Sequence, residues 1–123
     1  MKTVLLTDDN QDMIELVKLI LSQSGYRLIT ASDGEQAVKI GLEQKPDLVL
    51  MDLKMPKING FDAAKKLRDG GFTSPIIVLT ASESEEDREK AEAAGCNDYI
   101  LKTMNMTGVE RALDYYLAEE GGL

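Results

Sequence analysis

Five short apolar runs, separated by segments with helical periodicity, constrain the fold of this chain more than any other feature of its sequence. The runs are Val4–Leu6, Leu28–Ala31, Leu48–Met51, Ile76–Leu79 and Tyr99–Leu101. Short apolar runs between turn residues are typical of strands. The first intervening segment places Met13, Leu16, Val17 and Ile20 on one helical face, and the last one places Val109, Ala112, Leu113, Tyr116 and Leu117 on another. Successive strand–helix units predict a parallel sheet covered by helices on both faces.

The composition of each run predicts its place in the sheet. The first, third and fourth runs are continuously apolar, as expected of central strands with both faces covered. The second run lies in the stretch YRLITAS, which carries Arg27 and Thr30, and is predicted to form an edge. This pattern favours an α/β flavodoxin-like (βα)5 fold, a three-layer sandwich with strand order 2-1-3-4-5, over a closed barrel, which needs eight units. With 123 residues, we expect one domain over residues 1–123.

Local signals predict where helices begin and how firmly they are held. Asp33-x-x-Gln36 and Asn59-x-x-Asp62 resemble N-caps, and Thr107-x-x-Glu110 has the form of a capping box. The segment 83–95 contains no apolar side chain larger than alanine. We therefore expect its helix to be the least firmly anchored, unless close alanine packing holds it. Tyr115 falls off the apolar stripe of the last helix and should be exposed, whereas Cys96 should be a small buried side chain.

Composition excludes several classes of function. A net charge of −8 argues against nucleic-acid binding, because phosphate backbones require clustered Lys and Arg. No apolar stretch approaches the ~18 residues of a membrane span, and the N-terminus lacks the form of a signal peptide. With a single cysteine and no export signal, we expect a cytoplasmic location. The absence of histidine excludes histidine-based acid–base chemistry and histidine-ligated zinc.

Polar residues capable of chemistry follow four of the five predicted strands. Asp8 and Asp9 follow the first, Asp52 the third, Thr80 the fourth and Lys102 the fifth. Open α/β sheets bind ligands at the carboxyl edge, where these residues would meet. Each of them alone could be a turn residue, a helix cap or a solvated charge. Their coincidence at one edge favours a functional site.

The charges at this edge predict a metal. Carboxylates about 5 Å apart repel each other by roughly 3 kcal/mol per pair at an effective dielectric of 20. Lys102 offsets only one of the three negative charges. A hard divalent cation with oxygen ligands and retained waters, which describes Mg²⁺, would offset the rest. We therefore expect Asp52 to face Asp8 and Asp9 across Mg²⁺.

The chain resembles the receiver domain of two-component response regulators, including the single-domain chemotaxis regulators. The resemblance covers nearly the whole sequence and rests on LLTDDN, LVLMDLKMPKINGFD, PIIVLTA and AGCNDYILK in this order. It implies that Asp52 accepts a phosphoryl group from a phosphohistidine. It also implies that Asp9, Asp52 and the main-chain carbonyl of Lys54 bind Mg²⁺ directly, and Asp8 mainly through water. Lys102 would pair with the phosphoryl group and Thr80 would donate a hydrogen bond to it, while Tyr99 would be an aromatic switch that moves with Thr80.

Partners also follow from the resemblance. The donor would be a sensor histidine kinase or a histidine phosphotransfer protein. The output would be an effector protein or an attached output domain, contacted through the face formed by the fourth helix, fifth strand and fifth helix. One alternative is a receiver-like module that signals without phosphate. A Mg²⁺-dependent phosphohydrolase is a third possibility, but it would need a substrate pocket and a cap insertion for which 123 residues leave no room.

Two positions depart from the family pattern. Thr103 replaces the proline that usually follows the active-site lysine through a cis peptide. Because a cis bond before a non-proline residue costs about 2.5–4 kcal/mol, we predict a trans Lys102–Thr103 peptide and a rearranged loop from Lys102 to Met106. The side chain of Lys54 could lean over the acidic pocket, or it could be an ordinary solvated lysine; the sequence favours neither.

Overall fold

Strands and helices alternate along the chain. The computed structural model describes residues 2–53, 57–81, 84–102 and 107–117, and within these ranges five strands alternate with five helices. The strands are β1 (Thr3–Thr7), β2 (Arg27–Ala31), β3 (Leu48–Asp52), β4 (Ile76–Thr80) and β5 (Asp98–Leu101). The helices are α1 (Gln11–Ser24), α2 (Gly34–Gln44), α3 (Gly60–Asp69), α4 (Glu85–Ala93) and α5 (Thr107–Leu117).

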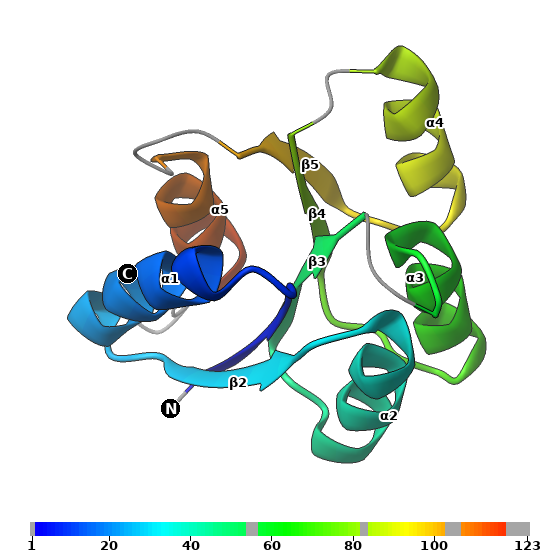
Figure 1. Cartoon of the computed structure of the whole chain (residues 1–123). Helices are drawn as coiled ribbons and strands as arrows, with labels where there is room; N and C mark the ends of the chain where they lie inside the picture. The colour runs from blue at the N-terminus through cyan, green and yellow to red at the C-terminus, as the bar shows by residue number, and fades with distance from the viewer. Residues whose placement is uncertain (1, 54–56, 82–83, 103–106, 118–123) are drawn as a thin grey trace.

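The strands form one parallel sheet in the order β2-β1-β3-β4-β5, which confirms the predicted order (Figure 1). Every residue of β3 and β4 is buried, whereas β2 has exposed residues at Arg27 and Thr30 and lies at an edge. Continuous apolar strands occupy the centre because only there are both faces covered by helices.

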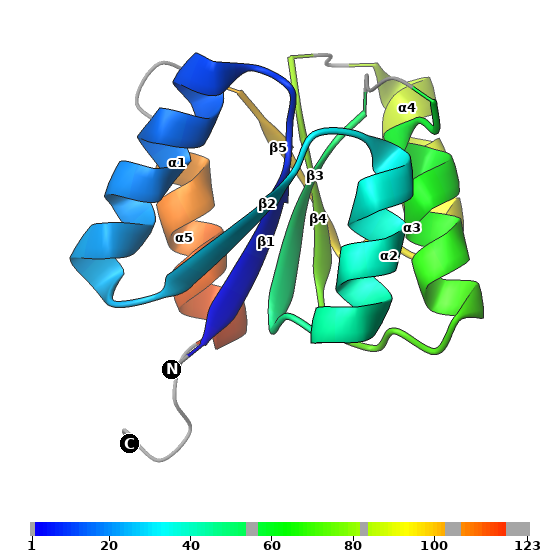
Figure 2. The ribbon, with the colours of Figure 1, turned by 60° about the horizontal axis from the view of Figure 1, so that its bottom comes forward.

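The molecule has three layers. Figure 2 shows α1 and α5 on one face of the sheet and α2, α3 and α4 on the other. Val17, Ile20, Leu113 and Leu117 pack with β1, β3 and β4 on the first face. The two predicted helical stripes therefore form the core on this side, with Met13, Leu16 and Tyr116 partly buried around it.

Side-chain caps begin the helices where the sequence predicted them. Asp33 Oδ1 accepts a hydrogen bond from Gln36 N at 2.8 Å, and Asn59 Oδ1 accepts one from Asp62 N at 2.9 Å. Each cap satisfies a backbone donor that the first helical turn leaves without a partner. Helix α5 begins at Thr107. The structure does not describe the side chain of Thr107, so the predicted capping box stays a prediction.

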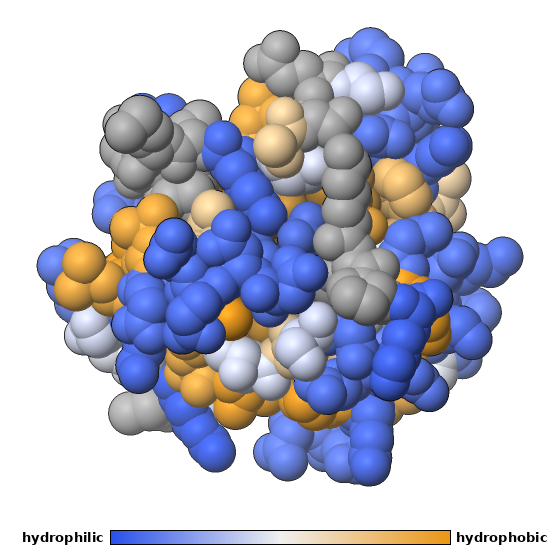
Figure 3. Space-filling view, viewed as in Figure 1, coloured by the Kyte–Doolittle hydropathy of each residue, from blue (hydrophilic) through white to orange (hydrophobic). Residues whose placement is uncertain are grey.

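Helix α4 has much less apolar anchorage than the other helices. The structure describes all of its residues, and among them Ala91 alone is buried, while Arg88, Glu89 and Lys90 are exposed. Hydrophilic residues accordingly cover the molecule over α4 (Figure 3). The prediction that α4 is the least firmly held helix rests on this contrast, and hydrogen exchange would test it.

The structure also tests two smaller predictions, for Tyr115 and Cys96. Tyr115 is 79% exposed, as predicted. Cys96, predicted to be buried, is only partly buried, and it packs against both the cluster under α2 and α3 and the cluster under α4. Within the described residues, no helix is long and apolar enough to cross a membrane.

Candidate functional site

The carboxyl ends of β1, β3, β4 and β5 meet around an open cleft. The strand register places Thr7 beside Met51, Asp52 beside Leu79, and Thr80 beside Leu101. Residues at the ends of these strands, or directly after them, therefore lie next to one another, as expected at the edge of a parallel sheet. The cleft has a volume of about 530 Å³ and is lined by Asp8, Asp9, Asn10, Asp52, Thr80, Ala81 and Lys102. The five residues predicted to gather at this edge are all among them.

Three carboxylates converge in the cleft. One oxygen from each of Asp8, Asp9 and Asp52 lies within 4.8 Å of the others. Asp8 and Asp52 are buried, whereas Asp9 is exposed. The main chain holds Asp8 in place, because Asp8 N donates to Ala31 O at 3.1 Å and Asp8 Oδ1 accepts from Asn10 N at 2.9 Å. Two buried acids so close together need an opposing charge.

Lys102 supplies part of that charge. Its ammonium lies 3.0 Å from Asp8 Oδ2 and 3.2 Å from Asp52 Oδ2. Lys102 N also donates to Thr80 O at 2.7 Å, which extends the pairing of β4 and β5 beyond the last strand residue and aims the side chain into the cleft. Burial alone would lower the pKa of Lys102, but hydrogen bonds and charge from Asp8 and Asp52 outweigh burial and raise it. The ammonium is therefore charged throughout the neutral pH range.

The remaining negative charge makes the cleft suitable for a divalent cation. Three carboxylates and one ammonium leave two net negative charges among the described side chains of the cleft. An oxygen-only set from a few carboxylates, with room for waters, suits Mg²⁺. Asp8, Asp9 and Asp52 are thus the described residues that fit this ion.

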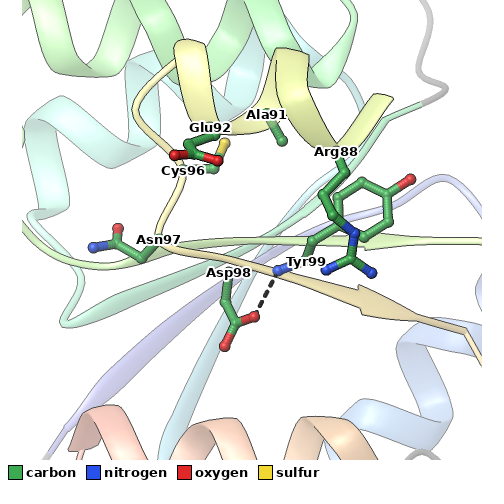
Figure 4. A pocket seen from close by; sticks show the side chains of 7 residues that line it. All are labelled: Arg88, Ala91, Glu92, Cys96, Asn97, Asp98 and Tyr99. Atoms are coloured by element: carbon green, nitrogen blue, oxygen red, sulfur yellow. Dashed lines mark hydrogen bonds between the residues drawn. The ribbon is translucent and has the colours of Figure 1, made fainter. Parts of the chain in front are cut away.

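Thr80 and Tyr99 lie on the same face of the neighbouring strands β4 and β5 but line different cavities. Thr80 is 3% exposed and lines the cleft. Tyr99 does not line the cleft; it lies on β5 beneath α4, where the Arg88 guanidinium carbon is 4.8 Å from its ring centroid. Figure 4 shows Arg88 of α4 against the Tyr99 ring, and both side chains line a pocket of about 400 Å³. The two expected switch residues therefore share one face of the sheet without lining one cavity.

Several predicted features fall outside the described residues. Lys54 is not among the described residues, so the expected binding of Mg²⁺ by its main-chain carbonyl stays a prediction, as does the position of its side chain. The Lys102–Thr103 peptide and the loop to Met106 are likewise not described.

The sequence indicates only weakly, or not at all, three residues that lie in the cleft or beside Tyr99. The pattern around Asn10 indicates a helix cap; its side chain does cap α1, accepting from Asp12 N and Met13 N, while its backbone also orients Asp8. Ala81 also lines the cleft, and in the sequence only its position directly after Thr80 indicates this. Arg88 could not be assigned to Tyr99, because the stacking joins a helix and a strand whose packing the local pattern does not specify.

Comparison with known proteins identifies relatives of this arrangement. Residues 4–114 match the family model described as the response regulator receiver domain. The chain is 40% identical over 101 residues to the alkaline phosphatase synthesis transcriptional regulatory protein PhoP of Bacillus subtilis. This match covers 82% of the chain but 42% of PhoP, so the chain spans less than half the length of that relative.

Solved structures agree with the family match. The receiver domain of sensor histidine kinase PA1611 from Pseudomonas aeruginosa, described with a magnesium ion in its active site cleft, has a TM-score of 0.86 and 32% identity. That match covers 96% of this chain and 98% of the other. The receiver domain of Ssk1 from Saccharomyces cerevisiae, solved with the histidine phosphotransfer protein Ypd1, has a TM-score of 0.86 and 30% identity. This second match covers 94% of the present chain and 88% of the matched chain.

Proposed function

The chain belongs to the response regulator receiver domain family, and from this membership we propose that it accepts a phosphoryl group on Asp52 in a Mg²⁺-dependent reaction. The observation that carries the proposal is the cleft in which Asp52 meets Asp8, Asp9, Thr80 and Lys102. The proposed receiver domain extends over residues 1–123. Because its relatives are named as regulators of transcription, we also propose that it works in the cytoplasm.

The proposed chemistry assigns one task to each residue. A carboxylate oxygen of Asp52 attacks the phosphorus of a phosphohistidine, the phosphorus–nitrogen bond breaks, and the imidazole nitrogen leaves with the electron pair. Asp52 is then an acyl phosphate, a known product of carboxylate nucleophiles. A water later attacks the same phosphorus, the bond from phosphorus to the Asp52 oxygen breaks, and inorganic phosphate leaves, which restores the free carboxylate. The domain thereby catalyses its own phosphotransfer and its own slow dephosphorylation.

Charge neutralisation and positioning supply the catalysis, as in other phosphoryl transfers. Asp8, Asp9 and Asp52 would hold Mg²⁺, whose contribution is to neutralise charge on the phosphoryl oxygens. Lys102, already 3.2 Å from Asp52 Oδ2, would pair with one of these oxygens. The Thr80 hydroxyl would donate to another. Asp9 is the exposed acid of the three and so faces incoming solvent and donor.

The proposed donor is a sensor histidine kinase or a histidine phosphotransfer protein. The structure of Ssk1 with Ypd1 supports this, because it joins a receiver domain of similar fold to such a protein. The proposed output is an effector protein or an attached output domain. PhoP is more than twice as long as its match to this chain, which supports the second form.

The proposed switch surface consists of α4, β5 and α5. Phosphorylation adds about −1.5 to −2 of charge beside Thr80, which can shift a pre-existing equilibrium between two conformations. Tyr99, under Arg88 in Figure 4, is the side chain proposed to move with Thr80. A helix with one buried residue, such as α4, can adjust to that movement at little cost in core packing.

Intact-mass measurement tests the proposal. The protein is incubated with acetyl phosphate, with and without Mg²⁺, beside an Asp52→Ala variant. We expect addition of one phosphoryl group only when Mg²⁺ and Asp52 are both present. If no adduct forms, binding of beryllofluoride separates two explanations: binding means fast hydrolysis, and no binding supports a module that works without phosphate.

A further inference from the structure

Two buried glycines lie against main-chain atoms near Asp52. A Cβ on Gly34 would overlap the carbonyl oxygen of Ile58, and a Cβ on Gly60 would lie 2.5 Å from the carbonyl oxygen of Asp52. At the other glycines in the described part of the chain, any neighbour closer than 3.0 Å is a side-chain atom. Neither Gly34 nor Gly60 has a positive φ, so the backbone would accept alanine. Lack of space, rather than conformation, therefore requires glycine at both positions.

Gly60 contacts the backbone of Asp52 directly. Its N–H donates to Leu53 O at 3.1 Å, so the first residue of α3 returns to the residue that follows the proposed phosphoacceptor. A side chain at this position would push against the main chain of Asp52 and Leu53. The start of α3 thus limits where the end of β3 can lie.

Gly34 makes the corresponding contact from α2. It is the first residue of that helix, and the Ile58 carbonyl carbon and Cβ both lie 2.9 Å from where a Gly34 Cβ would stand. Beside it, the Lys57 ammonium lies 3.8 Å from Asp33 Oδ2 and 3.6 Å from Glu35 Oε2. Because the Lys57 side chain is 62% exposed, these ion pairs contribute little. The close backbone contact at Gly34 is the firmer restraint.

We propose that Gly34 is a positioning residue for metal binding at Asp52: it seats Ile58, and through Gly60 it sets the position of the Asp52 main chain. The inference rests on the proposed function and adds α2, an element that supplies no residue to the described lining of the cleft. Mg²⁺ demands near-ideal octahedral geometry, so a small displacement of one carboxylate weakens its binding. The contacts run from Gly34 to Ile58, along the chain to Gly60, and from Gly60 to Asp52.

Direct measurement of Mg²⁺ affinity by calorimetry in Gly34→Ala tests this inference. The control is Gly41→Ala, a buried glycine of the same helix whose Cβ would meet the Leu67 side chain at 2.6 Å, away from Asp52. We expect Gly34→Ala to weaken Mg²⁺ binding by about tenfold, as for other outer-shell changes. Gly41→Ala should leave it within about twofold of wild type. With acetyl phosphate, Gly34→Ala should raise the half-saturating Mg²⁺ concentration more than it lowers the rate at saturating Mg²⁺.

The outcomes separate the inference from the proposed function. Unchanged Mg²⁺ affinity in a folded Gly34→Ala protein, with thermal stability reduced as in Gly41→Ala, would mean a purely structural role and overturn the inference alone. Wild-type protein that binds no Mg²⁺ would overturn the proposed function and this inference with it. If Gly34→Ala does not fold, amide NMR of the wild type decides. If Gly34 is in contact with a segment that moves when Mg²⁺ binds at Asp52, Mg²⁺ should shift the Gly34 and Glu35 resonances more than that of Gly41, and equal shifts would refute the inference.

Discussion

The Lys102 ammonium lies 3.0 Å from Asp8 Oδ2, although Lys102 follows β5, Asp8 follows β1, and β3 and β4 lie between these two strands in the sheet. The lysine therefore crosses the cleft and pairs with both buried acids rather than with Asp52 alone. Its positive charge stands where a divalent cation would also be attracted. Under the proposed function, lysine and metal would compete for the same carboxylates until a phosphoryl group gave the lysine another partner.

This competition predicts an unusual pair of effects for Lys102→Met. Removing the ammonium leaves the carboxylates with unrelieved repulsion, so Mg²⁺ should bind about tenfold more tightly. Phosphorylation by acetyl phosphate should nevertheless become slower, because no cation from position 102 pairs with the phosphoryl oxygens. Calorimetry measures the first effect and intact mass the second.

Lys66→Met is the matched control, since it removes the same charge from an exposed position on α3. It should change neither quantity by more than about twofold, because exposed charges beyond a Debye length are screened. Weaker Mg²⁺ binding in Lys102→Met than in wild type would contradict the competition.

Hydrogen exchange should distinguish α4 from α5. Ala91 is the only buried residue of α4, all of which the structure describes, whereas α5 buries Val109, Ala112, Leu113 and Leu117. Opening α4 exposes little apolar surface, so its amides should exchange at least about tenfold faster than those of α5. Equal protection in the two helices would mean that alanine packing and the Arg88–Tyr99 contact hold α4 firmly.

Arg68 should be a major contributor to stability. Its guanidinium donates to Gly95 O, Phe72 O, Ser74 O and Asn97 Oδ1 at 2.8–3.0 Å, joining the α3–β4 and α4–β5 connections. Arg68→Met removes the donor from each of these bonds and should lower the free energy of unfolding by about 2–4 kcal/mol.

Urea denaturation measures this loss, with Lys65→Met, an exposed position of the same helix, as control. Arg68→Lys should recover only part of the stability, because one ammonium cannot reach acceptors spread around a planar guanidinium. Full recovery by lysine would show that charge, rather than the arrangement of donors, matters.

Cys96 should contribute a stability that is lost in alkali. Burial raises the pKa of its thiol to about 11, against an opposing effect of Arg68, from an ordinary value of 9.0. The folded thiol holds its proton more tightly than the unfolded one. The contribution is therefore complete below pH 9.0 and disappears as pH rises to about 11.

A shift of this size corresponds to about 3 kcal/mol at most. Comparing the unfolding free energy of wild type with that of Cys96→Ala at several pH values isolates this group, because all other titrations are common to both. The advantage of wild type over the variant should shrink across this range. A constant difference would show that the thiol titrates near its ordinary value in the folded protein.

Strand and helix positions, and the edge at which the site forms, could be predicted from the sequence. Val4–Leu6 and Leu48–Met51 are apolar throughout because they lie in the covered centre of the sheet. Asp52 directly follows the second of these runs, and Asp8 follows the first after Thr7. Parallel strands bring their carboxyl ends to one edge, so both acids are expected there. Local order along the chain is sufficient for predictions of this kind.

Local sequence was thus enough to establish the alternation of strands and helices, the caps at Asp33 and Asn59, and the set of residues predicted at the cleft. Three contacts depended instead on how the elements pack: Lys102 with Asp8, Arg88 with Tyr99, and Gly34 with Ile58. Hydrophobic periodicity and capping act within a few residues of the chain, so they can be read from its order. These three contacts join distant segments, and their distances depend on how whole helices pack against the sheet.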